Sequence, residues 1–208
     1  MNKPKVALIT PSLGMGGAER WIVTLAKFFN EVDPYLILNL SGQSDSILLN
    51  EIPSTTRIIS NFYSRPEKII DALSDADVVI SWCFNLNLIL KDKLKCPTID
   101  VSHSDPQWKD HKSLIDHTSK NSKYHVGVSK IAASSYKKNN SDVIYNGIDT
   151  KRLKKSKGRI EQRKEWGCEN NKVVIFLSRL SEEKNPKILL ECSELFDESW
   201  KFLFVDIG

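Results

Sequence analysis

The stretch KVALITPSLGMGG, residues 5–17, decides the fold class. Its first six residues form a short, almost wholly apolar run rich in β-branched side chains, which is typical of a strand buried on both faces of a sheet. Pro11 ends that run, and a turn containing Gly14, Gly16 and Gly17 follows. Apolar residues then recur at the i, i+3, i+4 and i+7 spacing of an amphipathic helix: Ala18, Trp21, Ile22, Leu25, Phe28 and Phe29. The stretch therefore predicts a strand, a glycine loop and a helix.

The same alternation continues along the chain. Short apolar runs typical of strands occupy residues 35–40, 57–60, 77–81, 97–102, 124–129 and 142–146. Segments with helical character lie between them, at residues 46–51, 67–73, 86–94, 112–119 and 130–138. Repeated strand-helix-strand units place parallel strands in one sheet with helices on both faces. We therefore predict a Rossmann-like, doubly wound α/β domain over residues 1–150.

The character of the sequence changes after residue 150. Between residues 151 and 164, Glu161 is the single acidic residue among eight basic ones: Lys151, Arg152, Lys154, Lys155, Lys157, Arg159, Arg163 and Lys164. Strand and helix signals then return at residues 172–178, 186–196 and 201–206. We expect a basic linker or crossover over 151–171 and the start of a second Rossmann-like domain over 172–208, which holds too few elements to close its own core.

Composition narrows the class of protein. The 208 residues are 40% hydrophobic and 27% charged, which describes a globular chain rather than a disordered one. A net charge of +4 is too small to imply nucleic acid. The four cysteines form no C-x-x-C pair, which argues against a zinc site or a disulfide framework and favours a reducing cytoplasm. Neither a signal peptide nor a membrane span is expected.

The glycine loop suggests an anion site, because backbone N–H groups and a helix N-terminus converge there. The dinucleotide fingerprint G-x-G-x-x-G fits Gly14 and Gly16 but meets Glu19 at its third glycine, and the next predicted strand ends in Asn39-Leu40 instead of the ribose-binding acid. An oxidoreductase is therefore disfavoured. No Gly-Lys-Ser/Thr follows the turn, so it is not a Walker loop. The alternative is a glycine turn that serves only the tight connection.

Three further side chains are candidates for binding. His103 follows a predicted strand and should lie at the carboxyl edge of the sheet, where open α/β proteins bind ligands. Asp100, His103 and Asp105 are too weak a donor set for a metal, and we expect none. Arg179 and Lys184 lie in the loop before a helix that starts near Pro186, where two cations would suit a diphosphate. The alternative for that loop is a solvated one, paired with Glu182 and Glu183.

Three segments together resemble one family. PSLGMGGAERWIVTLA, then VGVSK with VIYNGIDTKRL, and SRLSEEKNPKILLE are similar, in order and spacing, to the group 1 (family 4) glycosyltransferases of GT-B architecture. The resemblance implies two Rossmann-like domains facing across a cleft, the N-terminal one for the acceptor and the C-terminal one for the donor. It also implies transfer from a nucleotide-diphosphate sugar to a glycan, lipid or other acceptor, with retention of configuration and without a bound metal.

The resemblance also assigns roles to individual residues. Gly16 and Gly17 would lie near the donor phosphates and the reacting centre, and His103 would approach the donor sugar. Arg179 and Lys184 would neutralise the leaving diphosphate. Glu19 and Arg20 occupy positions where the family often has the same pair, and would position the loop or meet the acceptor.

Two departures limit what the resemblance implies. Asn185 replaces the glycine that commonly follows the lysine. The paired glutamates that bind the donor's sugar and ribose belong downstream of Gly208, so we expect a fragment or truncated form whose own activity is doubtful. The expected setting is synthesis of a surface polysaccharide or glycolipid in the cytoplasm. The alternative is a noncatalytic carbohydrate- or membrane-binding module, in which residues 151–164 contact the inner face of a membrane.

Overall fold

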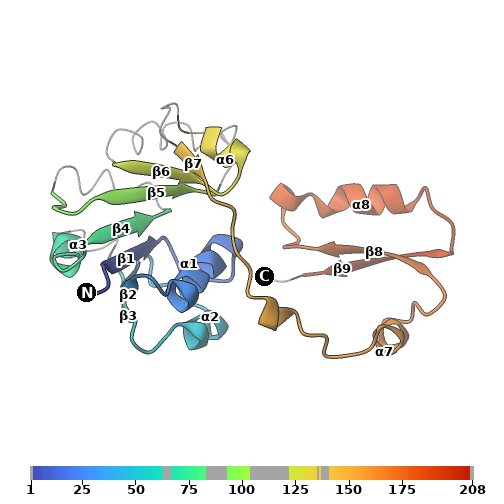
Figure 1. The fold of residues 1–208 in the computed structure, drawn as a ribbon. Coiled ribbons are helices and arrows are strands. Elements are labelled where there is room, and N and C mark those ends of the chain that lie inside the picture. The colour runs from blue at the N-terminus through green and yellow to red at the C-terminus, as the bar shows by residue number, and fades with distance from the viewer. Residues whose placement is uncertain are drawn as a thin grey trace. The chain divides into compact units, whose positions relative to one another are not determined.

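The computed structural model describes residues 2–62, 67–82, 93–103, 122–134, 136 and 141–206. The chain divides into two compact units, Met1–Ile148 and Asp149–Gly208. In the first unit, seven parallel strands form one sheet in the order β3-β2-β1-β4-β5-β6-β7 (Figure 1). The strands are β1 (Lys5–Thr10), β2 (Asp33–Asn39), β3 (Arg57–Ser60), β4 (Val78–Ser81), β5 (Thr98–Ser102), β6 (Tyr124–Gly127) and β7 (Ser141–Val143). The described helices of this unit are α1 (Gly17–Phe28), α2 (Ser46–Glu51), α3 (Glu67–Ala72) and α6 (Lys130–Ser134).

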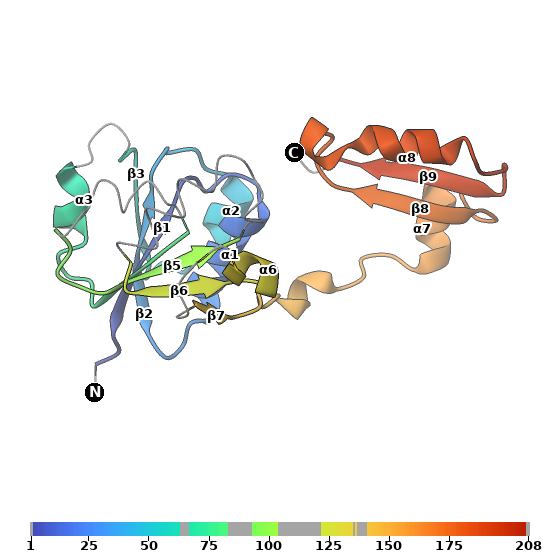
Figure 2. The same cartoon turned by 90° about the horizontal axis from the view of Figure 1, so that it is seen from above.

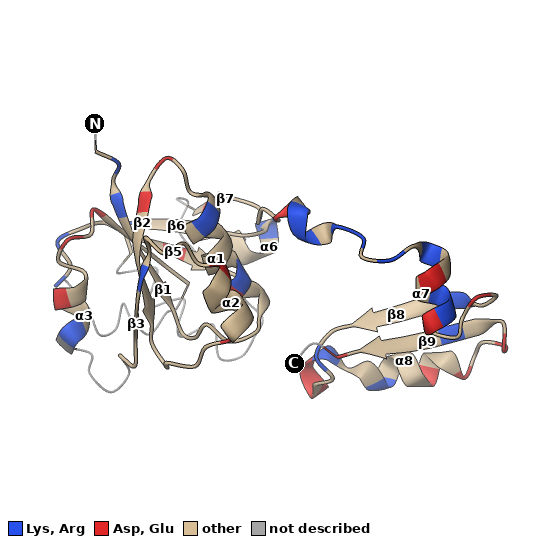
Figure 3. Cartoon of the chain, turned by 90° about the horizontal axis from the view of Figure 1, so that it is seen from below, with Lys and Arg blue, Asp and Glu red and all other residues tan. Residues whose placement is uncertain are grey.

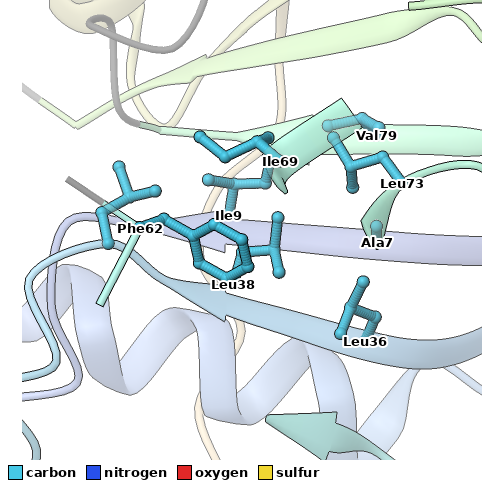
Figure 4. Packing of buried hydrophobic residues seen from close by; sticks show 9 residues of the cluster. Ala7, Ile9, Leu36, Leu38, Phe62, Ile69, Leu73 and Val79 are labelled. Atoms are coloured by element: carbon cyan, nitrogen blue, oxygen red, sulfur yellow. The ribbon is translucent and has the colours of Figure 1, made fainter. Parts of the chain in front are cut away.

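The central strand β1 is buried on both faces. Val6 and Leu8 belong to a core cluster that includes Ile22 and Ala26 of α1. The alternate residues Ala7 and Ile9 belong to a second cluster, formed with side chains of α3 and its flanking residues (Figure 4). Figure 2 shows α1 and α2 on one side of β1 and β2 and α3 on the other. Because successive side chains of a strand point to opposite faces, these two clusters show that helices cover both sides of the sheet.

Local sequence explains where the helices begin. The side chain of Asp45 caps α2 by accepting hydrogen bonds from the backbone N–H groups of Ile47 and Leu48. The start of α1 lacks such a cap, because its N-cap residue is Gly16. Glu19 lies in the first turn of α1, where a negative charge is favourable near the partial positive charge of the helix N-terminus.

The predicted α/β fold is confirmed, and most element boundaries agree within one or two residues. The last strand of the sheet is an exception, since it was predicted over 142–146 but β7 ends at Val143. Ile144 and Tyr145 are exposed beyond it, because β7 pairs only with β6 and their pairing ends there. The helix predicted at 130–138 is described only to Ser134, and those predicted at 86–94 and 112–119 lie almost wholly outside the described residues.

The second unit contains one complete strand-helix-strand motif. The parallel strands β8 (Lys172–Leu177) and β9 (Trp200–Val205) flank α8 (Pro186–Ser193), which ends before residue 196, the predicted end. The two strands also meet through their side chains, since the rings of Phe176 on β8 and Phe204 on β9 lie 5.7 Å apart between centroids, in a tilted arrangement. The basic segment forms the short 3₁₀ helix η1 (Thr150–Leu153) and α7 (Arg159–Glu165), and another 3₁₀ turn, η2 (Glu182–Lys184), precedes α8.

Gly127→Ala is expected to destabilise the first unit by about 1–3 kcal/mol, because a Cβ on Gly127 would overlap the backbone nitrogen of Ala133 in α6. Urea denaturation followed by circular dichroism measures the effect. Gly147→Ala is the matched control, since a Cβ there meets nothing within 4 Å, and its expected change is below about 0.5 kcal/mol. Equal stabilities of the two variants would contradict the close packing of α6 on β6.

Candidate functional site

The strand order reverses at β1, and this places the candidate site. The chain moves outward from β1 to β2 and β3 and then returns to add β4 on the other side of β1. In open α/β sheets, ligands bind at the carboxyl ends of the strands beside such a reversal. Thr10 ends β1, Trp82 directly follows β4 and His103 directly follows β5. These residues therefore lie at the edge where a ligand is expected.

The glycine loop after β1 is held by its neighbours. Leu13 is fully buried, its N–H donates to the carbonyl oxygen of Gln43 at 2.9 Å, and its own carbonyl accepts from the N–H of Asp45 at 2.8 Å. Asn39, also fully buried, donates from its side-chain amide to the carbonyl oxygen of Gln43 at 2.9 Å. Asn39 stands where a dinucleotide-binding protein would have its ribose-binding acid, and here it supports the neighbouring loop instead.

Glu19 folds back over the start of α1. The hydroxyl of Ser12 donates to Glu19 Oε1 at 3.0 Å, and a Cβ on Gly16 would overlap Glu19 Oε2. The backbone of Gly16 is extended, a conformation that any residue can adopt, so backbone strain does not require a glycine here. The lack of a side chain at Gly16 leaves room for the Glu19 carboxylate. A Cβ on Gly17 would meet nothing within 4 Å. Glu19 therefore positions the glycine loop and adds negative charge to it, while Gly17 borders open space.

Arg20 forms an ion pair with helix α2. Its guanidinium forms an ion pair with Glu51 at 2.7 Å, and the Nζ of Lys27 lies 4.0 Å from the same carboxylate. Both cations belong to α1, and Glu51 is the last residue of α2. In this structure Arg20 therefore joins the two helices that cover one face of the sheet.

His103 contacts two tryptophan rings. The centroid of its imidazole lies 4.7 Å from the ring of Trp21 on α1, in an edge-to-face arrangement, and 5.9 Å from the ring of Trp82. Burial lowers the pKa of His103 to about 4, so the imidazole is neutral at pH 7. Sequence reasoning placed His103 but missed Trp82, although Trp82 follows a strand in the same way.

Asp100 and Tyr136 form a buried pair that the sequence did not reveal. The hydroxyl of Tyr136 donates to Asp100 Oδ2 at 2.6 Å, and the ring of Tyr136 lies 4.7 Å from that of His125. Burial raises the pKa of Asp100 to about 7, and the bond from Tyr136 opposes that rise. Ile99 and Val101 pack on the α1 side, so Asp100 points to the opposite face of the sheet.

The described residues contain no group of three or more His, Cys, Asp and Glu side chains that could hold a metal ion. Asp105, which the sequence places near Asp100 and His103, lies outside those residues. The orientation of Asp100 also separates it from the side of the sheet on which His103 meets Trp21. None of the described helices has the length and apolar character needed to cross a bilayer.

In the second unit, one carboxylate joins the two predicted phosphate ligands. Glu183 Oε2 lies 3.2 Å from a guanidinium nitrogen of Arg179, and Glu183 Oε1 lies 3.0 Å from Lys184 Nζ. These cations lower the pKa of Glu183, with the hydrogen bond from Lys184 as the largest cause. Arg179 and Lys184 thus pair with Glu183 just beyond the carboxyl end of β8, which is the pairing that the solvated-loop alternative predicts. The role of the two cations as diphosphate ligands stays a prediction.

Asn185 makes the turn into α8 possible. Its φ and ψ are 46° and 58°, a left-handed conformation that favours glycine and that asparagine tolerates better than most other residues. Pro186 follows as the first residue of α8, where its missing N–H costs no helical hydrogen bond. The replacement of the expected glycine by Asn185 therefore preserves the helix start beside Lys184.

Comparison with known proteins identifies the fold. No protein-family model matches the chain, and no curated protein matches it. Among solved structures, Anabaena HepE in complex with UDP and glucose has a TM-score of 0.78 and 18% identity over 97% of this chain. The lipopolysaccharide outer core galactosyltransferase WaaB has a TM-score of 0.63 and 15% identity over 96% of it. UDP-GlcNAc 2-epimerase from Neisseria meningitidis, bound to UDP-GlcNAc, has a TM-score of 0.62 and 14% identity over 96%.

These similarities show a shared fold. The chain has the doubly wound, Rossmann-like architecture of a GT-B N-terminal domain, followed by the first elements of a second Rossmann-like domain. It spans 60% of the HepE chain, 60% of WaaB and 64% of the Neisseria epimerase.

Asp100→Asn is expected to remove a pH-dependent loss of stability. The carboxyl of Asp100 has a pKa of 3.8 when unfolded and about 7 when folded, so the folded state holds a proton that the unfolded state has lost between these values. Wild-type stability should therefore fall, relative to that of the variant, as the pH rises from 3.8 to about 7, and the difference should stay constant above that. Urea denaturation across this pH range measures it. A difference independent of pH would contradict the buried, protonated carboxyl.

Proposed function

We propose that this chain supplies the acceptor-side domain and the start of the donor-binding domain of a retaining glycosyltransferase of the group 1 (family 4) kind. The substrate would be a nucleotide-diphosphate sugar, and the acceptor a glycan or a lipid-linked glycan. The observation that carries the proposal is the position of Arg179 and Lys184 in the loop between the carboxyl end of β8 and the first residue of α8. The shared fold with WaaB and with HepE, whose structure contains UDP and glucose, supports it.

The chemistry of glycosyl transfer explains why two cations would be placed there. The bond between the anomeric carbon and the diphosphate oxygen breaks, and negative charge accumulates on the diphosphate as the sugar becomes oxocarbenium-like. The acceptor hydroxyl then bonds to the anomeric carbon, and its proton passes to the oxygen of the departing diphosphate. Arg179 can bond two phosphate oxygens while Lys184 acts as a point charge. Such preorganised cations stabilise the transition state more than the ground state, without requiring a metal ion.

The first unit would act on the sugars. We propose that His103 approaches the donor sugar as a neutral hydrogen-bonding group, and that the open space beside Gly17 admits the reacting part of the substrate. Gly16 would lie near the phosphates once the Glu19 carboxylate moves away from it. The setting that we propose is synthesis of a surface polysaccharide or glycolipid on the cytoplasmic side of a membrane.

Replacing both Arg179 and Lys184 with alanine is expected to weaken UDP binding by about 100-fold and to abolish sugar transfer, because two charge-assisted hydrogen bonds are lost. Calorimetry measures UDP affinity, and release of UDP from UDP-glucose measures turnover. Lys187→Ala is the matched control, since Lys187 lies on the exposed side of α8 and pairs with Glu191. Unchanged UDP affinity and turnover in the double variant would refute the assignment of these roles, and an epimerised sugar would indicate an epimerase.

A second candidate function rests on the basic segment. Leu153 and Ile160 are 68% and 83% exposed, and most of the cations around them in the sequence are exposed as well. Figure 3 shows the Lys and Arg positions of this segment in blue. Within this segment the Nζ of Lys157 pairs with Glu165 at 2.6 Å. Exposed apolar side chains among cations suit a surface that carries anionic lipid head groups, and we propose peripheral membrane contact through residues 151–164. The alternative is that this segment is a solvated linker.

Vesicle sedimentation distinguishes these two possibilities. The protein is expected to bind vesicles that contain phosphatidylglycerol at low salt and to bind them less at moderate salt, because the attraction is electrostatic and is screened by ions. It should not bind vesicles of phosphatidylcholine, which carry no net charge. Replacing Lys154 and Lys155 with alanine should weaken binding, whereas Lys187→Ala should not. Binding that is indifferent to both lipid charge and salt would remove the membrane proposal.

A further inference from the structure

Three aromatic rings from separate parts of the chain meet at the carboxyl edge of the sheet. Trp21 comes from the second turn of α1, Trp82 directly follows β4, and His103 directly follows β5. The ring planes of Trp21 and His103 make an angle of 68°, and those of Trp82 and His103 an angle of 58°. Such tilted contacts are the arrangements that aromatic pairs prefer. His103 is therefore held from two sides by side chains that offer its imidazole no charge.

Trp82 is itself held by the central strand. Its indole Nε1–H donates to Thr10 Oγ1 at 3.0 Å, and the hydroxyl of Thr10 donates in turn to the carbonyl oxygen of Ser12 at 2.6 Å. Thr10 is fully buried at the end of β1. One hydroxyl thus fixes both the ring beside His103 and the beginning of the glycine loop.

The imidazole of His103 has an unusual combination of properties. Its Nε2 is buried and has no hydrogen-bond partner among the described residues. Burial alone lowers its pKa, and no ionisable side chain of the described residues contributes to that shift. Leaving a buried polar atom unpaired is unfavourable, so a ligand that hydrogen-bonds to it recovers that free energy. A neutral imidazole can offer either an acceptor or a donor at Nε2, and a sugar hydroxyl can meet both.

We propose that Trp21 and Trp82 are positioning residues, which keep His103 neutral and its Nε2 available to a hydroxyl of the transferred sugar. This inference rests on the proposed function for the identity of the ligand. The arrangement of the rings is independent of it. Neither tryptophan needs to touch the reacting atoms, because each acts by excluding water from the imidazole and fixing its orientation.

The direct test is an NMR titration of the histidine rings in the 208-residue protein, with His103→Gln used to identify the His103 signal. The wild-type midpoint is expected at about 4, and in Trp21→Ala and Trp82→Ala it should move toward 6.5 as water reaches the imidazole. Trp82→Phe keeps an apolar ring there and should retain most of the lowered midpoint. Trp166→Ala, in the second unit, is the matched control and should leave the His103 titration unchanged.

Two results would overturn the inference. One is a wild-type midpoint near 6.5, which needs no variant and so cannot be obscured by poor folding. The other is a midpoint that stays near 4 in folded Trp21→Ala and Trp82→Ala proteins. Circular dichroism identifies which variants are folded, and Trp21→Phe and Trp82→Phe provide milder substitutions if the alanine variants are not.

Turnover separates this inference from the function on which it rests. If the His103 midpoint in Trp82→Ala reaches 6.5, the neutral fraction of His103 at pH 6 falls to about a quarter. The kcat of this variant should then decrease below pH 7, whereas the kcat of the wild type should not. A wild-type His103 midpoint near 4 without sugar transfer from UDP-glucose would support the positioning role of the tryptophans. The same result would count against the proposed glycosyltransferase function. Sugar transfer with the same pH profile in the wild type, Trp21→Ala and Trp82→Ala would overturn the positioning role alone.

Discussion

Burial of β1 on both faces is the constraint on which the first unit depends. Val6 and Leu8 can be buried only if α1 covers one face, and Ala7 and Ile9 only if α3 and its neighbours cover the other. Because β2 and β4 lie on opposite sides of β1, the strand order reverses at β1, and open α/β sheets bind ligands beside such a reversal. Thr10 then uses one hydroxyl to hold Ser12 and Trp82 at that edge. The packing of the core and the geometry of the candidate site therefore both depend on β1.

The two units offer different chemistry. The loop before α8 contains cations, and Arg179 and Lys184 already share the carboxylate of Glu183, as they would share a phosphate. The glycine loop of the first unit contains the Glu19 carboxylate and, nearby, a neutral imidazole. A diphosphate suits the side chains of Arg179 and Lys184, because its charge is opposite to theirs. Sugar hydroxyls suit the glycine loop, where hydrogen bonds and ring packing are available without a strong positive charge.

The sequence predicts the fold well because its signals are local. Apolar runs of strand length, the glycine turn at residues 14–17 and the restart at residue 172 each depend on neighbouring residues. The position of His103 also follows, since the end of a strand fixes the edge of the sheet that it reaches. The bonds of Asp100 to Tyr136 and of Trp82 to Thr10 could not be predicted, because they join residues that only the folded sheet brings together. The raised pKa of Asp100 has the same origin, since burial produces it.

The central claim is that this chain binds a nucleoside diphosphate through the loop between β8 and α8. Titration of the ¹⁵N-labelled 208-residue protein with UDP, followed by ¹H–¹⁵N NMR, tests it most directly. The expected result is a set of saturable shifts of the backbone amides in residues 178–185, which include Arg179, Lys184 and the left-handed Asn185. Absence of any shift in that loop at millimolar UDP, or shifts confined to other parts of the chain, would contradict the account.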